Sequence, residues 1–212
     1  YDIMNDLMSL GMHRLWKKRF VEIMDIKEND IILDVGSGSG DIASEILKEK
    51  LSTNLYLLDL NKEMLSEGRK RFKKQKNIKY FIGNAESLNF ESNFFDKYTI
   101  SFCLRNVTEY LLSIKEAYRV LKPGGKYFCL EFSTPKSPLI SSSYKIYKSI
   151  ILPILGDKIA KDKNAYKYLS ESIDLFPSQE DLSRKLIDLG FKKVETINLF
   201  NGIVAIHTGY KI

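Results

Sequence analysis

The stretch that decides the fold reads IILDVGSGSGD and covers residues 31–41. Three apolar residues precede Asp34, and glycines follow at positions 36, 38 and 40. Apolar residues then recur at helical spacing over residues 42–49, so the pattern predicts a strand, a tight turn and a helix. Glycine lets the backbone come close to a ligand, and the amides that open a helix lack intrahelical partners. The stretch is therefore typical of a ligand-binding junction.

Two cofactor classes bind at such a turn, and the neighbouring residues favour one of them. A dinucleotide site has the spacing Gly-x-Gly-x-x-Gly, and its pyrophosphate rests on the helix N-terminus. Here the third glycine comes one residue early, and Asp41 takes its place. Acidic side chains at 34 and 41 would repel phosphates but attract a cation, such as the sulfonium and amino groups of S-adenosylmethionine. The turn alone leaves both cofactors open, as well as a loop that binds nothing.

Length and composition predict one α/β domain over residues 1–212. Hydrophobic residues make up 44% of the chain, which is enough for the core of a single domain. The net charge of +6 comes mainly from dispersed lysines, and it fits a solvated surface or attraction to an anionic membrane. No basic run is interleaved with aromatic residues, so no nucleic-acid partner is expected. No run of eighteen apolar residues occurs, so no transmembrane helix is expected.

The two cysteines, Cys103 and Cys129, lie in apolar runs that predict strands. This position favours reduced core residues in a reducing compartment. The spacing of cysteine and histidine along the chain matches no metal-binding motif, so no metal is expected.

Outside the glycine turn the chain alternates predicted strands and helices. Strands are expected at residues 54–60, 78–82, 97–103 and 126–132, and helices at 61–72 and 112–121. Residues 1–24 carry apolar side chains at helical spacing and predict an N-terminal helical brace with a break at Gly11. In this brace Trp16 is expected to pack and not to take part in chemistry.

Polar residues follow several of the predicted strands. In doubly wound sheets ligands lie beyond the carboxyl ends of the strands, so these residues are candidates for a site. Asp59 ends the second strand and can accept both ribose hydroxyls of an adenosine, or else cap a helix. Asn84 and the small Ala85 follow the third strand, where an amide can bond the edge of an adenine. Arg105 follows the fourth strand, and a cation beside a sulfonium indicates an anionic substrate or transition state.

The last third of the chain departs from simple alternation. Residues 135–174 mix an apolar ridge with lysines and predict a helical insertion that roofs the pocket, rests on a membrane or packs on the core. A helix with a capping box follows from Ser178 to Gly190. Strands at 192–199 and 203–210 then flank Asn201-Gly202, a hairpin signal. Five strand-helix units and an antiparallel hairpin predict the Rossmann-like, seven-stranded sheet of class I methyltransferases that use S-adenosylmethionine.

Several stretches together resemble one family. The most specific are YDIMNDLMS at 1–9, LRNVT at 104–108 and GIVAIH at 202–207, whereas LKPGG at 121–125 occurs in many methyltransferases. With the glycine turn and NAE at 84–86, they resemble the ubiquinone/menaquinone biosynthesis C-methyltransferases of the UbiE type nearly from end to end. The turn departs from the family in having Gly36-Ser37 for Ala-Gly and Ser39 for Thr. Both changes keep small residues and a hydroxyl.

The resemblance implies methyl transfer from S-adenosylmethionine to a ring carbon of a polyprenylated quinol. The expected acceptor is a 2-methoxy-6-polyprenyl-1,4-benzoquinol of ubiquinone biosynthesis, with demethylmenaquinol as the alternative. By resemblance Ser39 holds the methionine end, Asp59 the ribose, and Asn84 with Ala85 the adenine. The full set of expected cofactor-binding residues is Asp34, Gly36, Gly38, Ser39, Asp59, Asn84, Ala85 and Ser101. Arg105 is the expected catalytic residue, since its charge would stabilise the quinol oxyanion.

Other roles and partners follow less directly. His13 and His207 match the family pattern but are expected to be structural. Another small-molecule methyltransferase, or a silent scaffold of a quinone-biosynthesis complex, are the competing interpretations. The family implies a homodimer or larger complex with peripheral membrane contact. Because the sequence does not begin with Met, we expect the mitochondrial matrix side of the inner membrane, with a bacterial cytoplasm as the alternative.

Overall fold

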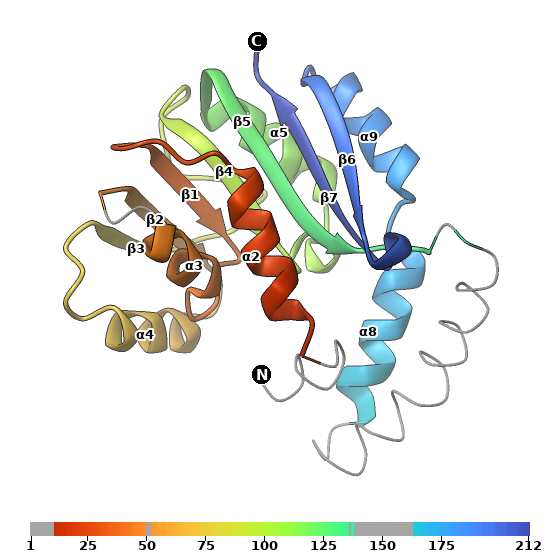
Figure 1. The fold of residues 1–212 in the computed structure, drawn as a ribbon, viewed down its shortest axis with the longest axis horizontal. Coiled ribbons are helices and arrows are strands. Elements are labelled where there is room, and N and C mark those ends of the chain that lie inside the picture. The colour runs from red at the N-terminus through yellow and green to blue at the C-terminus, as the bar shows by residue number, and fades with distance from the viewer. Residues whose placement is uncertain (1–10, 50–51, 136, 138–162) are drawn as a thin grey trace.

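The computed structural model describes residues 11–49, 52–135, 137 and 163–212, and builds them around one seven-stranded sheet (Figure 1). The strands are β1 (Ile31–Val35), β2 (Asn54–Asp59), β3 (Ile78–Ile82), β4 (Phe95–Ser101), β5 (Leu121–Phe132), β6 (Lys192–Leu199) and β7 (Val204–Tyr210). Their order across the sheet is β3-β2-β1-β4-β5-β7-β6. Strands β1 to β5 are parallel, and β7 runs antiparallel to both β5 and β6. The predicted fold class is confirmed.

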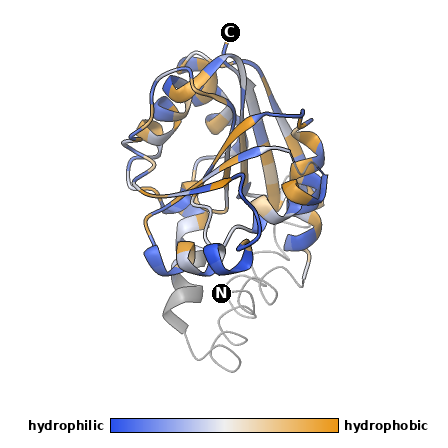
Figure 2. Ribbon diagram, turned by 90° about the vertical axis from the view of Figure 1, so that its left-hand side faces the viewer, coloured by the Kyte–Doolittle hydropathy of each residue, from blue (hydrophilic) through white to orange (hydrophobic). Residues whose placement is uncertain are grey.

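Helices cover both faces of this sheet. They are α2 (His13–Ile23), α3 (Asp41–Glu49), α4 (Lys62–Arg71), α5 (Tyr110–Val120), α8 (Lys163–Leu175) and α9 (Gln179–Asp188). Helices α2 and α3 pack on one face, and α5 and α9 pack on the other (Figure 1). With the β3 edge turned to the viewer, helices flank the sheet on either side (Figure 2). No helix in the described ranges is long and apolar enough to cross a membrane.

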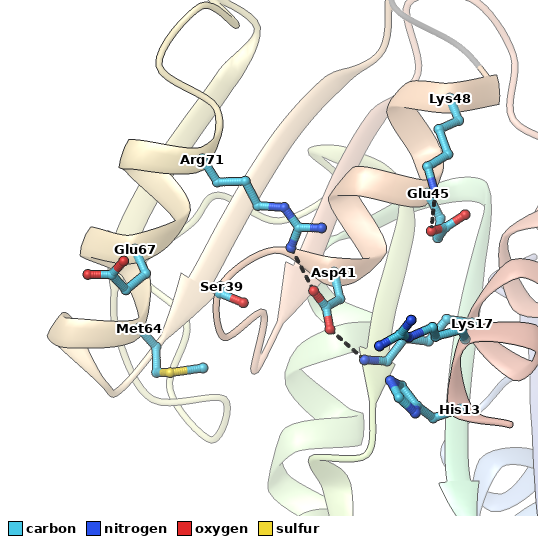
Figure 3. A pocket seen from close by; sticks show the side chains of 10 residues that line it. His13, Lys17, Ser39, Asp41, Glu45, Lys48, Met64, Glu67 and Arg71 are labelled. Atoms are coloured by element: carbon cyan, nitrogen blue, oxygen red, sulfur yellow. Dashed lines mark hydrogen bonds and ion pairs between the residues drawn. The ribbon is translucent and has the colours of Figure 1, made fainter. Parts of the chain in front are cut away.

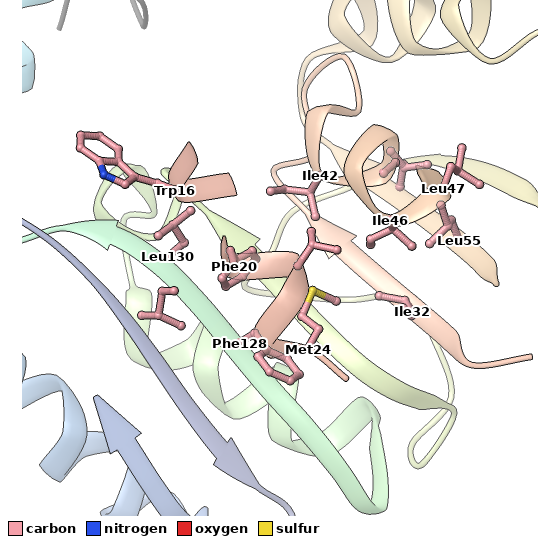
Figure 4. Packing of buried hydrophobic residues seen from close by; sticks show 14 of the residues in the cluster. Trp16, Phe20, Met24, Ile32, Ile42, Ile46, Leu47, Leu55, Phe128 and Leu130 are labelled. Atoms are coloured by element: carbon pink, nitrogen blue, oxygen red, sulfur yellow. The ribbon is translucent and has the colours of Figure 1, made fainter. Parts of the chain in front are cut away.

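A hydrophobic core holds α2 and α3 to the sheet (Figure 4). Phe20 of α2 is fully buried and meets Phe128 of β5 edge to face, with ring centroids 6.3 Å apart. Trp16, one turn earlier, packs against the rings of Phe132 and Phe102. The apolar spacing of α2 therefore buries one side of the helix. Trp16 packs, as its sequence context predicts.

Strand β1 lies where the order of the sheet reverses, between β2 and β4. Chain segments leaving β1 and β4 turn to opposite faces there, and a crevice opens beyond their carboxyl ends. The glycine turn starts at this point, directly after Val35. The topology thus places the turn at the position where doubly wound sheets bind ligands.

Local signals in the sequence located most element ends. The Asn61 side chain accepts a hydrogen bond from the Met64 amide at 3.0 Å, and Ser178 caps α9 through the Asp181 amide at 3.1 Å. Both caps were predicted. The hairpin at residues 199–204 is also present, with a short 3₁₀ turn η4 (Phe200–Gly202) between its strands.

Several predicted boundaries are wrong by two residues or more. Strand β4 begins at Phe95 and not at 97, and α5 begins at Tyr110 and not at 112. Strand β4 ends at Ser101 and not at 103, because Phe102 adopts a left-handed φ of +50° that leaves the sheet. Cys103 therefore lies beyond the strand. Strand β5 begins at Leu121 and not at 126, since Leu121 already pairs with Phe95 before the register shifts. The predicted helix over 1–10 and most of the insertion over 135–174 lie outside the described residues.

Candidate functional site

The glycine turn is fastened to the end of β2. The Gly36 and Ser37 amides both donate to the Leu58 carbonyl, at 2.8 and 3.1 Å. The Gly38 amide donates to Oδ2 of Asp59 at 2.7 Å. These three amides are therefore satisfied internally, and the ligand-facing character of the turn rests on its shape and on the side chains around it.

Glycine at position 36 is required by both conformation and space. Its φ is +64°, which L side chains rarely adopt. A Cβ at this position would lie 2.2 Å from Sγ and 2.6 Å from Cβ of Cys103. The segments that follow β1 and β4 consequently approach closely at this point.

The main cavity lies beyond the ends of β1, β2 and β3 and is closed on one side by residues 102, 103 and 106–108. Its volume is about 360 Å³, within the range of small-molecule sites, roughly 300–1,000 Å³. Five predicted cofactor-binding residues line it: Gly36, Gly38, Asp59, Asn84 and Ala85. The structure brings together residues that the sequence separates by up to 49 positions.

Asp59 is held in place before any ligand arrives. Its Oδ2 accepts the Gly38 amide at 2.7 Å, and its Oδ1 accepts the Asn61 amide at 2.8 Å. Each carboxylate oxygen has a second lone pair that can accept another hydrogen bond. The carboxylate is therefore fixed with acceptor capacity left for two neighbouring hydroxyls, as on a ribose.

Ser39 and Ser101 lie around a smaller cavity of about 40 Å³ on the other side of the turn, here called the turn cavity. Gly36, Gly38, Met64 and Phe102 line both this cavity and the main cavity. The turn cavity also receives the Lys17 side chain from α2, which the sequence analysis did not single out. The two serines thus belong to the same site as Asp59, on its opposite flank.

Asp34 lies beneath the turn and is 1% exposed. Thr99 of β4 donates to its Oδ1 at 2.9 Å, while Oδ2 is buried with no hydrogen-bond partner among the described residues. Burial, helped by the negative charges of Asp59 and Asp41, raises the pKa of Asp34 to about 7. A cation above the turn would favour the ionised carboxylate, so this arrangement fits the positively charged S-adenosylmethionine.

Arg105 lies on a 3₁₀ turn, η1 (Leu104–Asn106), and does not line the main cavity. Its Nη1 donates to Glu131 Oε1 and to the Phe102 carbonyl, both at 2.8 Å. Its side chain is 9% exposed, and Nε is buried with no partner among the described residues. The Glu131 partner was missed by the sequence analysis, although a carboxylate in an apolar strand was a visible signal.

Arg105 instead lines a second cavity of about 250 Å³ between η1 and α8, here called the η1–α8 cavity. Most of the other lining residues are apolar or aromatic: Leu104, Val107, Tyr110, Tyr168, Leu175, Phe176 and Pro177. Val107 and Thr108 line this cavity and the main cavity together. One short segment therefore separates the main cavity, which contains the Asp59 carboxylate, from a cavity that contains a buried cation.

The two histidines occupy different surroundings. His207 of β7 is 2% exposed and donates from Nε2 to the Gln179 carbonyl at 3.1 Å. Burial lowers its pKa to about 4, so it is neutral at physiological pH. It touches no cavity near the turn, and this placement supports the structural role. His13 lines a larger polar cavity of about 650 Å³ between α2, α3 and α4 (Figure 3).

Two further expectations concern cysteines and metals. Cys103 and Cys129 are both free thiols, and burial raises the pKa of Cys103 to about 12. Such a thiol is protonated and unreactive at neutral pH. Within the ranges that the structure describes, no group of three or more His, Cys, Asp or Glu side chains is arranged to hold a metal ion.

Comparison with known proteins gives a consistent result. Residues 1–211 match the model of the ubiE/COQ5 methyltransferase family. Proteins named ubiquinone/menaquinone biosynthesis C-methyltransferase UbiE, from Rickettsia prowazekii and Rickettsia typhi, are each 49% identical over 220 residues. Each alignment covers all of this chain and 88% of the relative.

Solved structures share the fold at low sequence identity. An S-adenosylmethionine-dependent methyltransferase from Aquifex aeolicus has a TM-score of 0.69 at 17% identity, and the match covers 100% of this chain and 98% of that one. Phosphoethanolamine N-methyltransferase 2 from Haemonchus contortus, solved with S-adenosyl-L-methionine, has a TM-score of 0.70 at 17% identity. That match covers 92% of this chain and 52% of the other.

Proposed function

The chain belongs to the ubiE/COQ5 methyltransferase family and is an S-adenosylmethionine-dependent C-methyltransferase, and we propose that its acceptor is a polyprenylated benzoquinol of ubiquinone biosynthesis. The proposed acceptor is a 2-methoxy-6-polyprenyl-1,4-benzoquinol, methylated on a ring carbon. Demethylmenaquinol is compatible with the names of the relatives and is the second acceptor to test.

The observation that carries this proposal is a buried cation in an apolar cavity beside the cofactor site. The η1–α8 cavity is lined by aromatic and aliphatic side chains and adjoins the main cavity at Val107 and Thr108. Arg105 is the charged group in its lining. An apolar ring that develops negative charge on its oxygen fits these two properties together.

The cofactor residues would act by position. Asp59 would accept the ribose hydroxyls, Asn84 and Ala85 would face the adenine, and Ser39 with Ser101 would lie towards the methionine end. Bound S-adenosylmethionine supplies an electrophilic methyl group on a positively charged sulfur. Alignment of that methyl with the acceptor carbon would provide much of the rate acceleration, because in-line transfer depends on orientation.

Arg105 would stabilise the acceptor as an oxyanion. Loss of the quinol hydroxyl proton spreads negative charge to the ortho ring carbon, which makes this carbon nucleophilic. A guanidinium nearby favours the charged form and so lowers the pKa of the hydroxyl. Arginine stays protonated in proteins, so we propose that a water bound to Arg105 relays the hydroxyl proton to bulk solvent. After methyl transfer, the methylated ring carbon loses its hydrogen as a proton to solvent, which restores the aromatic ring. Nε has no hydrogen-bond partner among the described residues, so we propose it as a donor to that water or to the oxyanion.

The same proposal extends to location. Leu60 follows β2 and Ile82 is the last residue of β3, both at the carboxyl edge of the sheet, and they are 69% and 62% exposed. A polyprenyl acceptor resides in a membrane, and exposed aliphatic side chains near the site favour peripheral contact with one. The mitochondrial location expected from the sequence finds no support in the Rickettsia relatives, which are bacterial. We propose the bacterial alternative, and a homodimer remains a prediction.

The acceptor is tested by mass spectrometry. The protein is incubated with methyl-labelled S-adenosylmethionine and short-chain demethyl benzoquinol or demethyl naphthoquinol under reducing conditions. Label on a benzoquinol ring carbon is the expected result, and preference for naphthoquinol would transfer the proposal to menaquinone biosynthesis. Absence of label on both, with cofactor binding intact, would favour the scaffold or another acceptor.

The role of Arg105 is tested by substitution. Arg105→Gln is expected to lose most turnover while retaining the affinity for S-adenosylhomocysteine, and Arg105→Lys is expected to recover part of the turnover because it keeps the charge. Arg184→Gln on the exposed face of α9 is the control. Unchanged turnover in Arg105→Gln would remove the proposed role.

A further inference from the structure

One carboxylate joins three helices beside the glycine turn. Asp41, the first residue of α3, accepts a hydrogen bond from Lys17 Nζ of α2 at 2.7 Å and from Arg71 Nη1 of α4 at 2.6 Å (Figure 3). Burial alone would raise the pKa of Asp41, but the two cations outweigh it and lower the pKa. Asp41 is therefore ionised, and it pairs with two positive charges.

This cluster has one positive charge more than it has negative charge. The other acids in the polar cavity are already paired, since Glu45 meets Lys48 at 2.6 Å and Glu67 meets Lys70 at 2.7 Å. The surplus thus remains on the Lys17–Asp41–Arg71 cluster. Lys17 has a side chain only 10% exposed, so water screens its charge weakly.

Lys17 places part of this surplus positive charge beside the turn cavity. It lines that cavity together with Ser39 and the glycines, and it also lines the polar cavity on the other side. An ammonium group has three donors, and the described hydrogen bonds use one of them, to Asp41. Ser37 lines the same cavity, and its Oγ is buried with no hydrogen-bond partner among the described residues. The Lys17 ammonium and the Ser37 hydroxyl can therefore both donate a hydrogen bond to an acceptor in the turn cavity.

We propose that Lys17 binds the α-carboxylate of the methionine moiety of S-adenosylmethionine, with Ser37 as a second donor. The carboxylate is the one anionic group of that cofactor, and the turn cavity is where a surplus positive charge meets the expected methionine end at Ser39. The α-amino group has the opposite charge and suits Asp41. The proposal concerns the cofactor alone and does not depend on the identity of the acceptor.

The purely structural alternative is that Lys17 only ties α2 to α3. The two roles differ in which ligand atoms they affect. A tie between helices would change the affinity for every ligand of the site, whereas a carboxylate contact would change only the affinity for ligands that carry the carboxylate. Decarboxylated S-adenosylmethionine keeps the sulfonium, ribose and adenine and lacks only this group, so it separates the two roles.

Equilibrium binding of both ligands is measured by calorimetry for the wild type, Lys17→Met, Lys17→Arg and Lys48→Met. Lys48 lines the polar cavity but is paired with Glu45 and does not line the turn cavity, so it is the matched control. A lost charge-assisted contact is expected to weaken S-adenosylmethionine binding to Lys17→Met by about tenfold or more. Binding of the decarboxylated ligand should stay near the wild-type value, and Lys17→Arg should recover affinity for the carboxylate.

Two results would overturn the proposal. One is an equal loss of affinity for both ligands in Lys17→Met, which would assign Lys17 a structural role. The other is unchanged affinity for S-adenosylmethionine in that variant. Thermal unfolding of each variant shows whether it is folded. If Lys17→Met does not fold, Ser37→Ala provides the ligand comparison, because it removes the second proposed donor and should weaken binding of S-adenosylmethionine but not of the decarboxylated ligand. A failure of quinol methylation would leave these binding results unaffected.

Discussion

The carboxylate of Glu131 holds Arg105 at two points, since Oε1 accepts Nη1 at 2.8 Å and Oε2 accepts the backbone amide at 3.3 Å. The side chains of this pair are only 9% and 2% exposed. Glu131 therefore fixes both the guanidinium and the turn that separates the main cavity from the η1–α8 cavity.

Loss of Glu131 is expected to be costly. Glu131→Ala leaves a buried guanidinium without its counter-charge, and the free energy of unfolding should fall by roughly 3–5 kcal/mol. The exposed pair Arg19–Glu22 is the comparison, because Glu22→Ala should change stability by about 1 kcal/mol or less. Urea unfolding measures both. Similar losses in the two variants would contradict the buried pair's importance.

A second variant separates stability from chemistry. Replacing Arg105 and Glu131 together with Met removes both buried charges, which is often neutral for stability. The double variant is expected to be more stable than Glu131→Ala and yet inactive. Activity in the double variant would show that the guanidinium is dispensable for methyl transfer.

Asp34 is expected to make stability depend on pH. Its pKa rises from 3.8 to about 7 on folding, so between pH 4 and 7 the folded chain keeps a proton that the unfolded chain releases. The contribution of Asp34 to stability should therefore fall as pH rises through this window, by about 4 kcal/mol in total. Asp34→Asn removes the titrating carboxyl group. The stability of this variant relative to the wild type should therefore increase from pH 4 to 7 and stay constant above pH 7.

Urea unfolding at several pH values measures this difference. The same substitution removes a negative charge beneath the turn, so S-adenosylmethionine should bind more weakly to Asp34→Asn even though the variant is more stable. A constant stability difference across the window would contradict the raised pKa.

His207 is expected to act over nearly the same pH range as Asp34 but with the opposite sign. Its pKa falls from 6.5 to about 4 on folding, so the unfolded chain binds a proton first as pH decreases. Its stability contribution should be complete above pH 6.5 and should decrease by about 3 kcal/mol as pH falls towards 4. His207→Gln should lose this dependence and keep normal turnover at pH 8. A large loss of turnover at that pH would indicate a catalytic histidine.

Gly36 is expected to tolerate no side chain. In Gly36→Ala the energetic cost of the left-handed φ adds to the cost of the steric clash with Cys103. The free energy of unfolding should therefore fall by about 2–5 kcal/mol, and cofactor binding should be lost. Gly124 is a matched control, because its φ is +84° but nothing lies within 4 Å of the position that a Cβ would take there. Thermal unfolding of Gly124→Ala reports backbone strain alone. Equal shifts in both variants would show that the Cys103 contact is unimportant.

The sequence predicted those features that depend on neighbouring residues. The periodicity of residues 31–49 predicted the strand, the glycine turn and the helix. The two helix caps are also local, because Asn61 and Ser178 each accept a hydrogen bond from an amide three residues later. The antiparallel pairing of the last two strands followed from the hairpin signal. The topology of the sheet then placed Asp59 and Asn84 beside the same cavity.

Features that depend on distant residues were not predicted. Arg105 pairs with a residue 26 positions later, and Lys17 pairs with one 24 positions later, so neither contact leaves a local pattern. The end of β4 depends on the positive φ of Phe102, a conformation that its aromatic side chain does not favour. The predicted roles of the site residues remain predictions, and the substitutions above test them.

The placement of β7 between β5 and β6 has a consequence for biosynthesis. Among the strands that the structure describes, β6 has no neighbour other than β7, although β6 is synthesised before β7. The pairing of β5 with residues 204–210 spans a chain separation of about 80 residues. A ribosome-bound chain that stops before residue 204 would therefore expose the edge of β5 and the unpaired β6 together. Closure of the sheet must wait for residues 204–210, and a nascent chain is open to chaperones and proteases until then.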